Sequence, residues 1–197
     1  MKRMILVSSP PACGKTFISK QLAMALGSVV YLDKDTLIPL SKQIFRVAKK
    51  PYDRSSDFFE ENVRDYEYDA IMDVACEALA FNDTVILNAP FTRELRNADY
   101  VSRLKDRLNK LGARLTVIWI VATPEICRER MKRRRSDRDV YKIARWDDYV
   151  RTVDFSPPAA VTTDEHADDE LLLFYNSSEA EYLKSMHDVL AVLNREK

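Results

Sequence analysis

Three consecutive residues near the beginning of the chain have the side chains needed to hold a phosphorylated ligand. Gly14 precedes Lys15 and Thr16 where an apolar run gives way to a stretch with helical periodicity. The unpaired amides at the start of a helix suit a phosphate group, and a glycine lets the backbone approach it closely. Lys15 can reach the terminal phosphates, and the Thr16 hydroxyl can bind a magnesium ion that bridges them.

These residues complete the nucleotide-binding P-loop pattern G-x-x-x-x-G-K-[S/T], in which Ser9 replaces the first glycine. Serine restricts the backbone there, and Pro10 and Pro11 stiffen the turn. A chance Gly-Lys-Thr is the alternative, but a predicted strand before the loop and a predicted helix after it favour the P-loop. The residues expected to bind ATP are Pro11, Ala12, Cys13, Gly14, Lys15, Thr16 and Phe17.

Cys13 lies inside this loop, where the start of a helix can make a thiol reactive. No catalytic base adjoins it, so we favour the interpretation that it fills a variable position of the loop. Together with Cys76 and Cys127 it makes an odd number of widely spaced cysteines, which fits neither a disulfide framework nor a zinc site. With only His166 and His187, no histidine-based metal site or Ser-His-Asp triad can be assembled.

Two carboxylates follow the second predicted strand. Asp33 and Asp35 stand at its carboxyl end, where ligands of doubly wound sheets collect. Phosphoryl transfer to an alcohol needs a carboxylate that orients or deprotonates the hydroxyl, and acidic groups that hold magnesium. We expect Asp35 to be catalytic and Asp33 to bind the metal with Thr16, although either aspartate could serve the acceptor. Asp35 is also a good candidate for a helix N-cap.

Strands and helices alternate along the chain, which predicts a parallel sheet with right-handed crossovers. The predicted strands are Met4–Ser8, Val29–Leu32, Thr84–Leu87, Leu115–Val121 and Leu171–Tyr175. The predicted helices are Lys15–Leu26, Leu37–Lys49, Asp57–Phe81, Leu95–Leu111, one from Pro124 into an arginine cluster, and Ala180–Leu193. We expect an α/β fold of the P-loop NTPase type, with a five-stranded parallel sheet and helices on both faces.

Composition limits the remaining possibilities. A chain of 197 residues with 46% apolar residues can bury one core, so we expect a single domain over residues 1–197. The formal net charge is zero, so no global field directs the protein to nucleic acid or to a membrane. The absence of a signal peptide, of a long apolar run and of a disulfide framework predicts a cytoplasmic protein.

Four motifs occur in order along the chain: SSPPACGKT at 8–16, LDKD at 32–35, VILNAPFTRE at 85–94 and RMKRRRSDRD at 130–139. With them the chain resembles the small P-loop kinases, which include zeta-toxin kinases, chloramphenicol phosphotransferase, polynucleotide 5′-kinases, and gluconate and shikimate kinases. More narrowly, it resembles bacterial stand-alone ATP-binding proteins labelled AAA family ATPases. The resemblance implies that Asp35 matches the acceptor-side aspartate.

The chain departs from these relatives at Asn88, where many carry an aspartate. An amide cannot act as a base, so the chemical role shifts to Asp33 and Asp35.

The arginine cluster has a role by the same resemblance. Arg130, Arg134 and Arg138 recur every four residues and share one face while the helix continues. In such kinases a lid delivers arginines to the phosphates, so we expect a lid over about 128–146. Arg130 would bind the nucleotide, and Arg134 and Arg138 would stabilise the transferring phosphoryl group. A solvated basic helix that touches nucleic acid is the alternative.

The function that these features favour is ATP- and Mg²⁺-dependent transfer of a phosphoryl group to a hydroxyl of a small molecule or nucleoside-like acceptor. One rival is a nucleotide-binding switch protein that hydrolyses ATP slowly. Another is a polynucleotide 5′-hydroxyl kinase, which the arginine cluster favours and the zero net charge opposes. The expected partners are therefore ATP and a small acceptor, not nucleic acid or a membrane.

Overall fold

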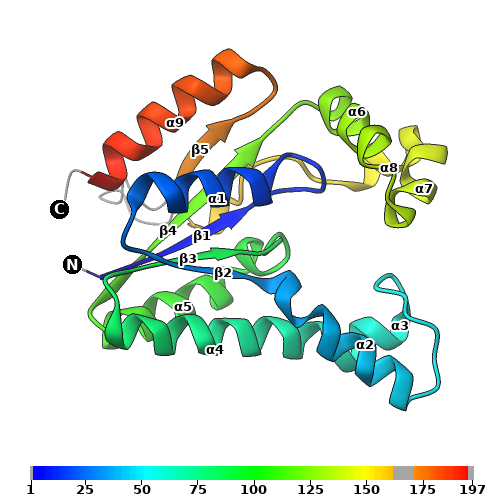
Figure 1. Ribbon diagram of the computed structural model, residues 1–197, viewed down its shortest axis with the longest axis horizontal. Coiled ribbons are helices and arrows are strands. Elements are labelled where there is room, and N and C mark those ends of the chain that lie inside the picture. The colour runs from blue at the N-terminus through cyan, green and yellow to red at the C-terminus, as the bar shows by residue number, and fades with distance from the viewer. Residues whose placement is uncertain (1, 162–170, 195–197) are drawn as a thin grey trace.

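Five strands form one parallel sheet whose carboxyl ends meet at the same edge (Figure 1). The computed structural model describes residues 2–161 and 171–194, with only the backbone of residues 137 and 138. The strands are β1 (Lys2–Ser8), β2 (Val30–Asp33), β3 (Thr84–Asn88), β4 (Ala113–Val121) and β5 (Leu171–Tyr175). Their order across the sheet is β2-β3-β1-β4-β5. The predicted α/β class and the five-stranded parallel sheet are confirmed.

Helices cover both faces of this sheet, with α4 and α5 along one face and α1 and α9 along the other (Figure 1). The helices are α1 (Lys15–Leu26), α2 (Ile38–Val47), α3 (Asp57–Phe59), α4 (Asp65–Phe81), α5 (Ala98–Lys110), α6 (Pro124–Arg134), α7 (Asp137–Ala144), α8 (Trp146–Thr152) and α9 (Glu179–Asn194). Short helical turns are η1 (Lys34–Leu37), η2 (Glu60–Arg64), η3 (Glu94–Arg96) and η4 (Ala159–Val161). In the described ranges, no helix is long and apolar enough to cross a membrane.

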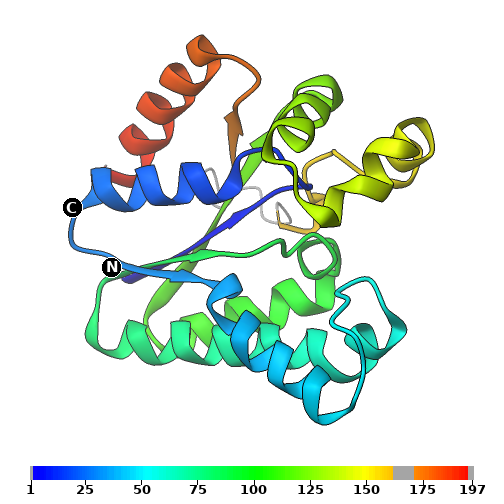
Figure 2. The same ribbon diagram turned by 45° about the vertical axis from the view of Figure 1, so that its right-hand side comes forward.

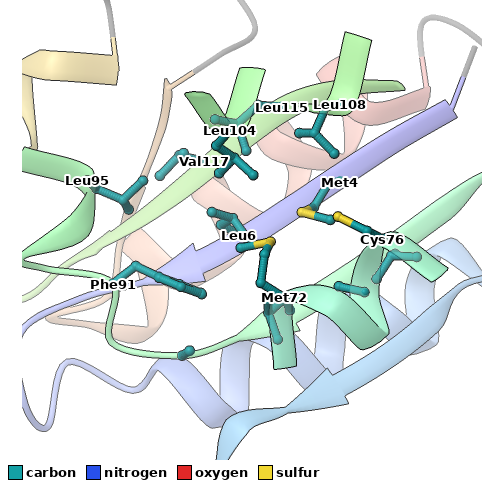
Figure 3. Packing of buried hydrophobic residues seen from close by; sticks show 14 of the residues in the cluster. Met4, Leu6, Met72, Cys76, Phe91, Leu95, Leu104, Leu108, Leu115 and Val117 are labelled. Atoms are coloured by element: carbon teal, nitrogen blue, oxygen red, sulfur yellow. The ribbon is translucent and has the colours of Figure 1, made fainter. Parts of the chain in front are cut away.

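The alternation of side chains along β1 divides the core into two clusters. Met4 and Leu6 pack with residues of α4 and α5, as Figure 3 shows for Met72. Ile5 and Val7 point to the opposite face and pack with residues of α1 and α9. Because β1 is buried on both faces, as parallel strands are, it holds the loop that follows it at the centre of the sheet.

The predicted helix from Asp57 to Phe81 is interrupted. It consists of α3, the π-helical turn η2 and α4. The wider turn contains Arg64, which is buried and forms an ion pair with Glu94, with 2.7 Å between Nη2 and Oε1. Periodicity predicts a helix over this segment. It does not predict the wider turn at η2, where Arg64 contacts Glu94 beyond β3.

Two groups of helices extend past the carboxyl ends of the strands. One consists of α2 and α3, and the other of α6, α7 and α8 (Figure 1). The loop between β1 and α1 lies between them, and Figure 2 shows the same separation from another direction. The sheet therefore presents this loop to a region that both groups border.

Candidate active site

The loop between β1 and α1 leads into a helix whose first turn is not capped by any side chain. Gly14 occupies the N-cap position, with no side-chain hydrogen bond and no acidic residue in the first turn. The first helical hydrogen bond runs from the Ile18 amide to the Gly14 carbonyl over 3.1 Å. The amides before Ile18 therefore point out of the end of the helix, as in an anion-binding site.

Gly14 is required by both backbone geometry and space. Its φ of 102° lies in the left-handed region, and an added Cβ would stand 2.4 Å from Nδ2 of Asn176. Asn176, which follows β5, donates Nδ2–H to the Cys13 carbonyl at 2.8 Å. Arg130 of α6 donates to the same carbonyl at 2.9 Å and to the Asn176 carbonyl at 2.6 Å. The loop is thus fixed from the far edge of the sheet, through an asparagine that the sequence analysis missed.

The serine that replaces the first glycine of the motif creates no backbone conflict. Ser9 is not among the described residues with a left-handed backbone, whereas Ala12 has a φ of 67°. The Ser9 hydroxyl donates to the Pro10 carbonyl over 2.8 Å. The loop therefore accepts serine at this position, and its one left-handed non-glycine residue is Ala12.

Asn88, at the end of β3, joins three of the predicted site residues. Its Oδ1 accepts a hydrogen bond from Lys15 Nζ at 3.2 Å. Its Nδ2 donates to Thr16 Oγ1 at 3.2 Å and to Asp33 Oδ2 at 2.8 Å. The structure thus brings Lys15, Thr16 and Asp33 together around the residue that the sequence analysis treated as a loss of function. A neutral amide can both accept from the lysine and donate to the carboxylate, which an aspartate could not do.

Two further side chains position Asp33. The Tyr31 hydroxyl donates to Asp33 Oδ2 at 3.2 Å, and Ser19 of α1 lies 3.4 Å from the same hydroxyl. Burial raises the pKa of Tyr31, so the hydroxyl keeps its proton at neutral pH. Neither Tyr31 nor Ser19 was predicted from the sequence, although Tyr31 stands two residues before Asp33 and so shares its face of β2.

The residues around Asn88 fit a magnesium ion. Thr16 Oγ1 and Asp33 Oδ2 both contact the same amide nitrogen, and such oxygen donors are the ligands that Mg²⁺ prefers. In the described part of the chain, no group of three or more His, Cys, Asp or Glu residues could hold a metal by itself. This set suits an ion that is shared with the phosphates of a nucleotide.

Asp35 is placed differently from Asp33. Asp33 caps η1 through Oδ1, which accepts from the Asp35 amide at 3.0 Å, so the interpretation of Asp35 as the N-cap is wrong. The Asp35 side chain is 51% exposed, and its Oδ1 lies 3.6 Å from Nη1 of Arg54. Its carboxylate therefore faces the surface and remains accessible to a ligand, which fits an acceptor-side role.

A buried ion pair lies behind Asp35. Lys34 Nζ is 2.5 Å from Glu67 Oε2, and Arg54 Nη2 is 2.7 Å from the same oxygen. Ser41 donates to the other oxygen of Glu67. Burial lowers the pKa of Lys34. Neither Glu67 nor Arg54 was predicted from the sequence. Helical periodicity does not distinguish one acidic residue of a long helix from its neighbours, and Arg54 lies outside any sequence motif.

The expectation that three arginines share one helical face is wrong. Helix α6 ends at Arg134, Arg135 adopts a left-handed backbone with a φ of 48°, and Arg138 belongs to α7. A left-handed residue changes the direction of the chain, so the four-residue spacing no longer predicts a common face. The side chain of Arg138 lies outside the described residues.

The two other arginines are engaged within the protein. Arg130 binds the backbone carbonyls of the loop and of Asn176. Arg134 donates Nη2–H to Oδ1 of the buried Asp139 at 2.6 Å and also contacts its second oxygen. Both guanidinium groups are therefore already bound to acceptors within the protein.

A cavity of about 450 Å³ lies beside the start of α1. Its lining residues come from α1, α6 and the segment from β5 to α9: Phe17, Ile126, Glu129, Arg130, Arg133, Asn176, Ser177, Ser178, Glu179 and Tyr182. The rings of Phe17 and Tyr182 are 5.7 Å apart. Exposed aromatic faces beside polar groups suit a flat heterocycle with hydrogen-bonding edges.

Cys13 points away from the cavity. Its Sγ is buried 3.6 Å from Sγ of Cys127. The hydrogen bond with Cys127, followed by burial, raises the pKa of the Cys13 thiol, which therefore stays protonated at neutral pH. This agrees with the interpretation of Cys13 as a filler of the loop and not as a reactive thiol.

Comparisons with known proteins agree with this geometry. A protein-family model described as "AAA domain" matches residues 4–156. No curated protein matches the chain.

Solved structures resemble the chain over almost its whole length. A gluconokinase from Sinorhizobium meliloti 1021 has 15% sequence identity and a TM-score of 0.51, over 99% of this chain and 94% of that one. Shikimate kinase from Acinetobacter baumannii, in complex with shikimate, has 17% identity and a TM-score of 0.51, over 100% and 96%. Chaetomium thermophilum Kti12, in complex with ADP-AlF3, has 19% identity and a TM-score of 0.54, over 96% and 98%. At these identities the likeness shows the fold, which is that of the P-loop kinases, as expected.

Proposed function

The chain belongs to the AAA domain family, and from this membership we propose that it is an ATP-dependent phosphotransferase. It moves the γ-phosphate of ATP to a hydroxyl of a small molecule or nucleoside-like acceptor. The observation that carries the proposal is the convergence of Lys15, Thr16 and Asp33 on Asn88, beside the uncapped start of α1. The resemblance to a gluconokinase and to a shikimate kinase supports the same reaction class.

The nucleotide occupies the loop and the neighbouring cavity. Its β- and γ-phosphates lie at the start of α1, where the backbone amides and the Lys15 ammonium neutralise them. The base lies beside the neighbouring rings of Phe17 and Tyr182, in the cavity that Arg133 also lines. Thr16 and Asp33 hold the magnesium ion, which supplies charge neutralisation at the phosphates when it is bound.

The acceptor lies on the other side of the phosphates. Phosphoryl transfer proceeds with the attacking and leaving oxygens roughly in line, so the acceptor hydroxyl stands opposite the nucleoside. The cavity adjoins β5 at one edge of the sheet, and β2 forms the opposite edge. Asp35, exposed just after β2, orients the hydroxyl and accepts its proton.

We propose the segment 128–146 as a lid in a single domain over residues 1–197. Arg130 holds the loop in shape for the nucleotide. Arg138, whose side chain lies outside the described residues, keeps its predicted role at the transferring phosphoryl group. Arg134 can take that role only by exchanging Asp139 for phosphate. Added hydrogen-exchange protection across 128–146 on binding a non-hydrolysable ATP analogue is the expected result for a lid.

Labelled phosphate tests the reaction. ATP carrying ³²P at the γ-position is incubated with Mg²⁺, the protein and a panel of alcohols, nucleosides and 5′-hydroxyl oligonucleotides. Transfer of the label to a small hydroxyl compound supports the proposal. Release of the label only as inorganic phosphate would identify the nucleotide-dependent switch instead, and transfer only to oligonucleotides would identify the polynucleotide kinase.

A further inference from the structure

We propose that the acceptor carries no anionic group and is an uncharged or cationic hydroxyl compound. The inference rests on the proposed function and concerns the side of the site where the acceptor hydroxyl would lie. It follows from the ion pairs that the charged side chains near Asp35 already form within the protein.

Nine charged residues form a linked cluster that we call the acceptor-side network. They follow β2, follow β3 or lie on the segment between them: Lys34, Asp35, Arg54, Glu60, Arg64, Asp65, Glu67, Arg93 and Glu94. The Tyr68 ring connects its two halves, because Lys34 Nζ lies 5.0 Å and the Arg64 guanidinium 4.4 Å from the ring centroid. The network therefore spans the carboxyl ends of two neighbouring strands on the side of Asp35.

Every cation of the network already has a carboxylate partner. Lys34 and Arg54 share Glu67, at 2.5 and 2.7 Å. Arg64 contacts Glu94 at 2.7 Å and Asp65 at 2.9 Å. Arg93, the most exposed of the four, lies 2.6 Å from Asp65 and 3.4 Å from Glu60.

Burial makes these pairings hard to exchange. Lys34, Arg64, Glu67 and Glu94 are all buried. Withdrawing a cation from such a partner would leave a buried carboxylate with less compensation for its charge, which is unfavourable. An anionic acceptor could therefore draw Lys34 or Arg64 toward it only with that penalty, and Arg93 only by replacing its exposed ion pairs with Asp65 and Glu60.

The network also has an excess of negative charge and an unused acceptor of hydrogen bonds. Five carboxylates face four cations among the nine residues. Glu94 Oε2 is buried and has no hydrogen-bond partner in the described part of the chain. Asp35 is half exposed and paired only loosely, at 3.6 Å. These carboxylates attract hydroxyl and ammonium donors, and they repel a carboxylate or a phosphate.

The test uses hydroxyl compounds in matched triplets that share a carbon skeleton and differ in charge, such as glucitol, 1-amino-1-deoxyglucitol and gluconate. ADP release from ATP-Mg is measured with each compound, and transfer is verified with γ-labelled ATP. The neutral or cationic member of an active triplet should be used at least about tenfold more efficiently than its anionic member, the scale of one charge contact near a protein surface.

The three possible outcomes are distinct. Preference for a neutral or cationic member supports the inference. Preference for anionic members would overturn it and leave the proposed phosphotransferase intact. If no compound of any class stimulated ADP release or received the label, the proposed function would fail and the inference with it.

Charge variants test the cause of the preference. Glu67→Gln releases Arg54 and Lys34 from a shared carboxylate and should make inhibition by anionic members about tenfold stronger. Because Glu67 is buried, Asp65→Asn serves as a second variant, since it is exposed and partly releases Arg93. Asp73→Asn is the matched control, because it breaks an exposed pair with Arg107 outside the network. Equal inhibition in all of these variants would contradict the role of the network.

Discussion

The regions on the two sides of the loop both contain arginines, but the charges of these arginines are neutralised in different ways. On the side of α3 and α4, Arg54, Arg64 and Arg93 each form at least two ion pairs. On the side of α6 to α8, several arginines form no ion pair with any residue that the structure describes: Arg128, Arg133, Arg135 and Arg145. The two regions lie on opposite sides of the loop between β1 and α1 (Figure 1).

This difference shows that the zero net charge of the chain conceals a local asymmetry. A guanidinium without a carboxylate partner can form short, charge-assisted hydrogen bonds with an external anion. One that is already paired must first lose its partner. Hence the α6 to α8 side is suited to a polyanionic nucleotide and the α3 to α4 side to a ligand without negative charge. Four predictions test this division.

The largest effect is expected at Lys15, which lies between the two regions. Lys15→Ala removes an ammonium group that contacts Asn88 and should lower ATP-Mg affinity by about 10³-fold, the scale of losing a preorganised charged donor. Isothermal calorimetry measures the affinity. Lys20→Ala, exposed on the same helix, is the control and should bind normally. Undiminished affinity in Lys15→Ala would place the phosphates elsewhere and remove the basis of the division.

Asp35→Asn tests the acceptor side alone. The substitution keeps the size of the side chain and removes its charge, so turnover should fall by about 10²-fold, the usual scale for losing a general base. ATP-Mg affinity should change little, because Asp35 faces Arg54 and not the loop. Steady-state kinetics and calorimetry measure the two effects separately. Unchanged turnover would transfer the catalytic role to Asp33.

Arg134→Ala distinguishes a structural arginine from a catalytic one. Asp139 is buried, and without Arg134 its carboxylate would lose its ion pair. Because the Arg134 side chain is 31% exposed, we expect a loss of about 2 kcal/mol in the free energy of unfolding, below the range for a fully buried pair. Urea denaturation measures this loss, with Arg133→Ala as the stable control. If stability were unchanged while turnover fell, Arg134 would act on phosphate and not on Asp139.

The smallest effect is expected for ATP-Mg binding by Arg133→Ala, and comparison with Arg93→Ala contrasts the two regions directly. Arg133→Ala removes an arginine that lines the cavity without an ion pair, and should weaken ATP-Mg binding by about tenfold, the lower range for a hydrogen bond to a charged group. Arg93→Ala removes an arginine that is paired with Asp65 and Glu60, and should leave ATP-Mg binding unchanged. Equal effects in calorimetry would refute the proposed division of charge.

The sequence predicts well those features that depend on neighbouring residues. All five strands and the start of α1 at Lys15 agree with the structure, because buried parallel strands and amphipathic helices have distinct periodicities. The P-loop is recognisable for the same reason, since Gly14, Lys15 and Thr16 act through local backbone geometry.

Features that depend on distant partners were missed or predicted wrongly. Arg130 and Arg134 have the correct spacing for one face, but the left-handed backbone at Arg135 ends α6 before Arg138. From the sequence, Asn88 was interpreted as a position that cannot act as a base. Its contacts with Lys15 and Asp33 form only when the sheet brings the three residues together. Spacing predicts which side chains share a face while a helix continues. It predicts neither where the helix ends nor which partner each side chain contacts.

The contact of Asn176 with the loop has a consequence for the order in which the site forms during synthesis. Its hydrogen bond to the Cys13 carbonyl joins residues 163 positions apart. On the ribosome, a nascent chain exposes the whole P-loop motif long before it exposes this asparagine, and contacts of such separation form late. A translation intermediate that ends before β5 therefore has Arg130 but lacks Asn176, one of the two side chains that donate to the Cys13 carbonyl. A loop held by fewer hydrogen bonds is less preorganised for phosphate, so a nucleotide stabilises the finished protein more than its shorter precursors.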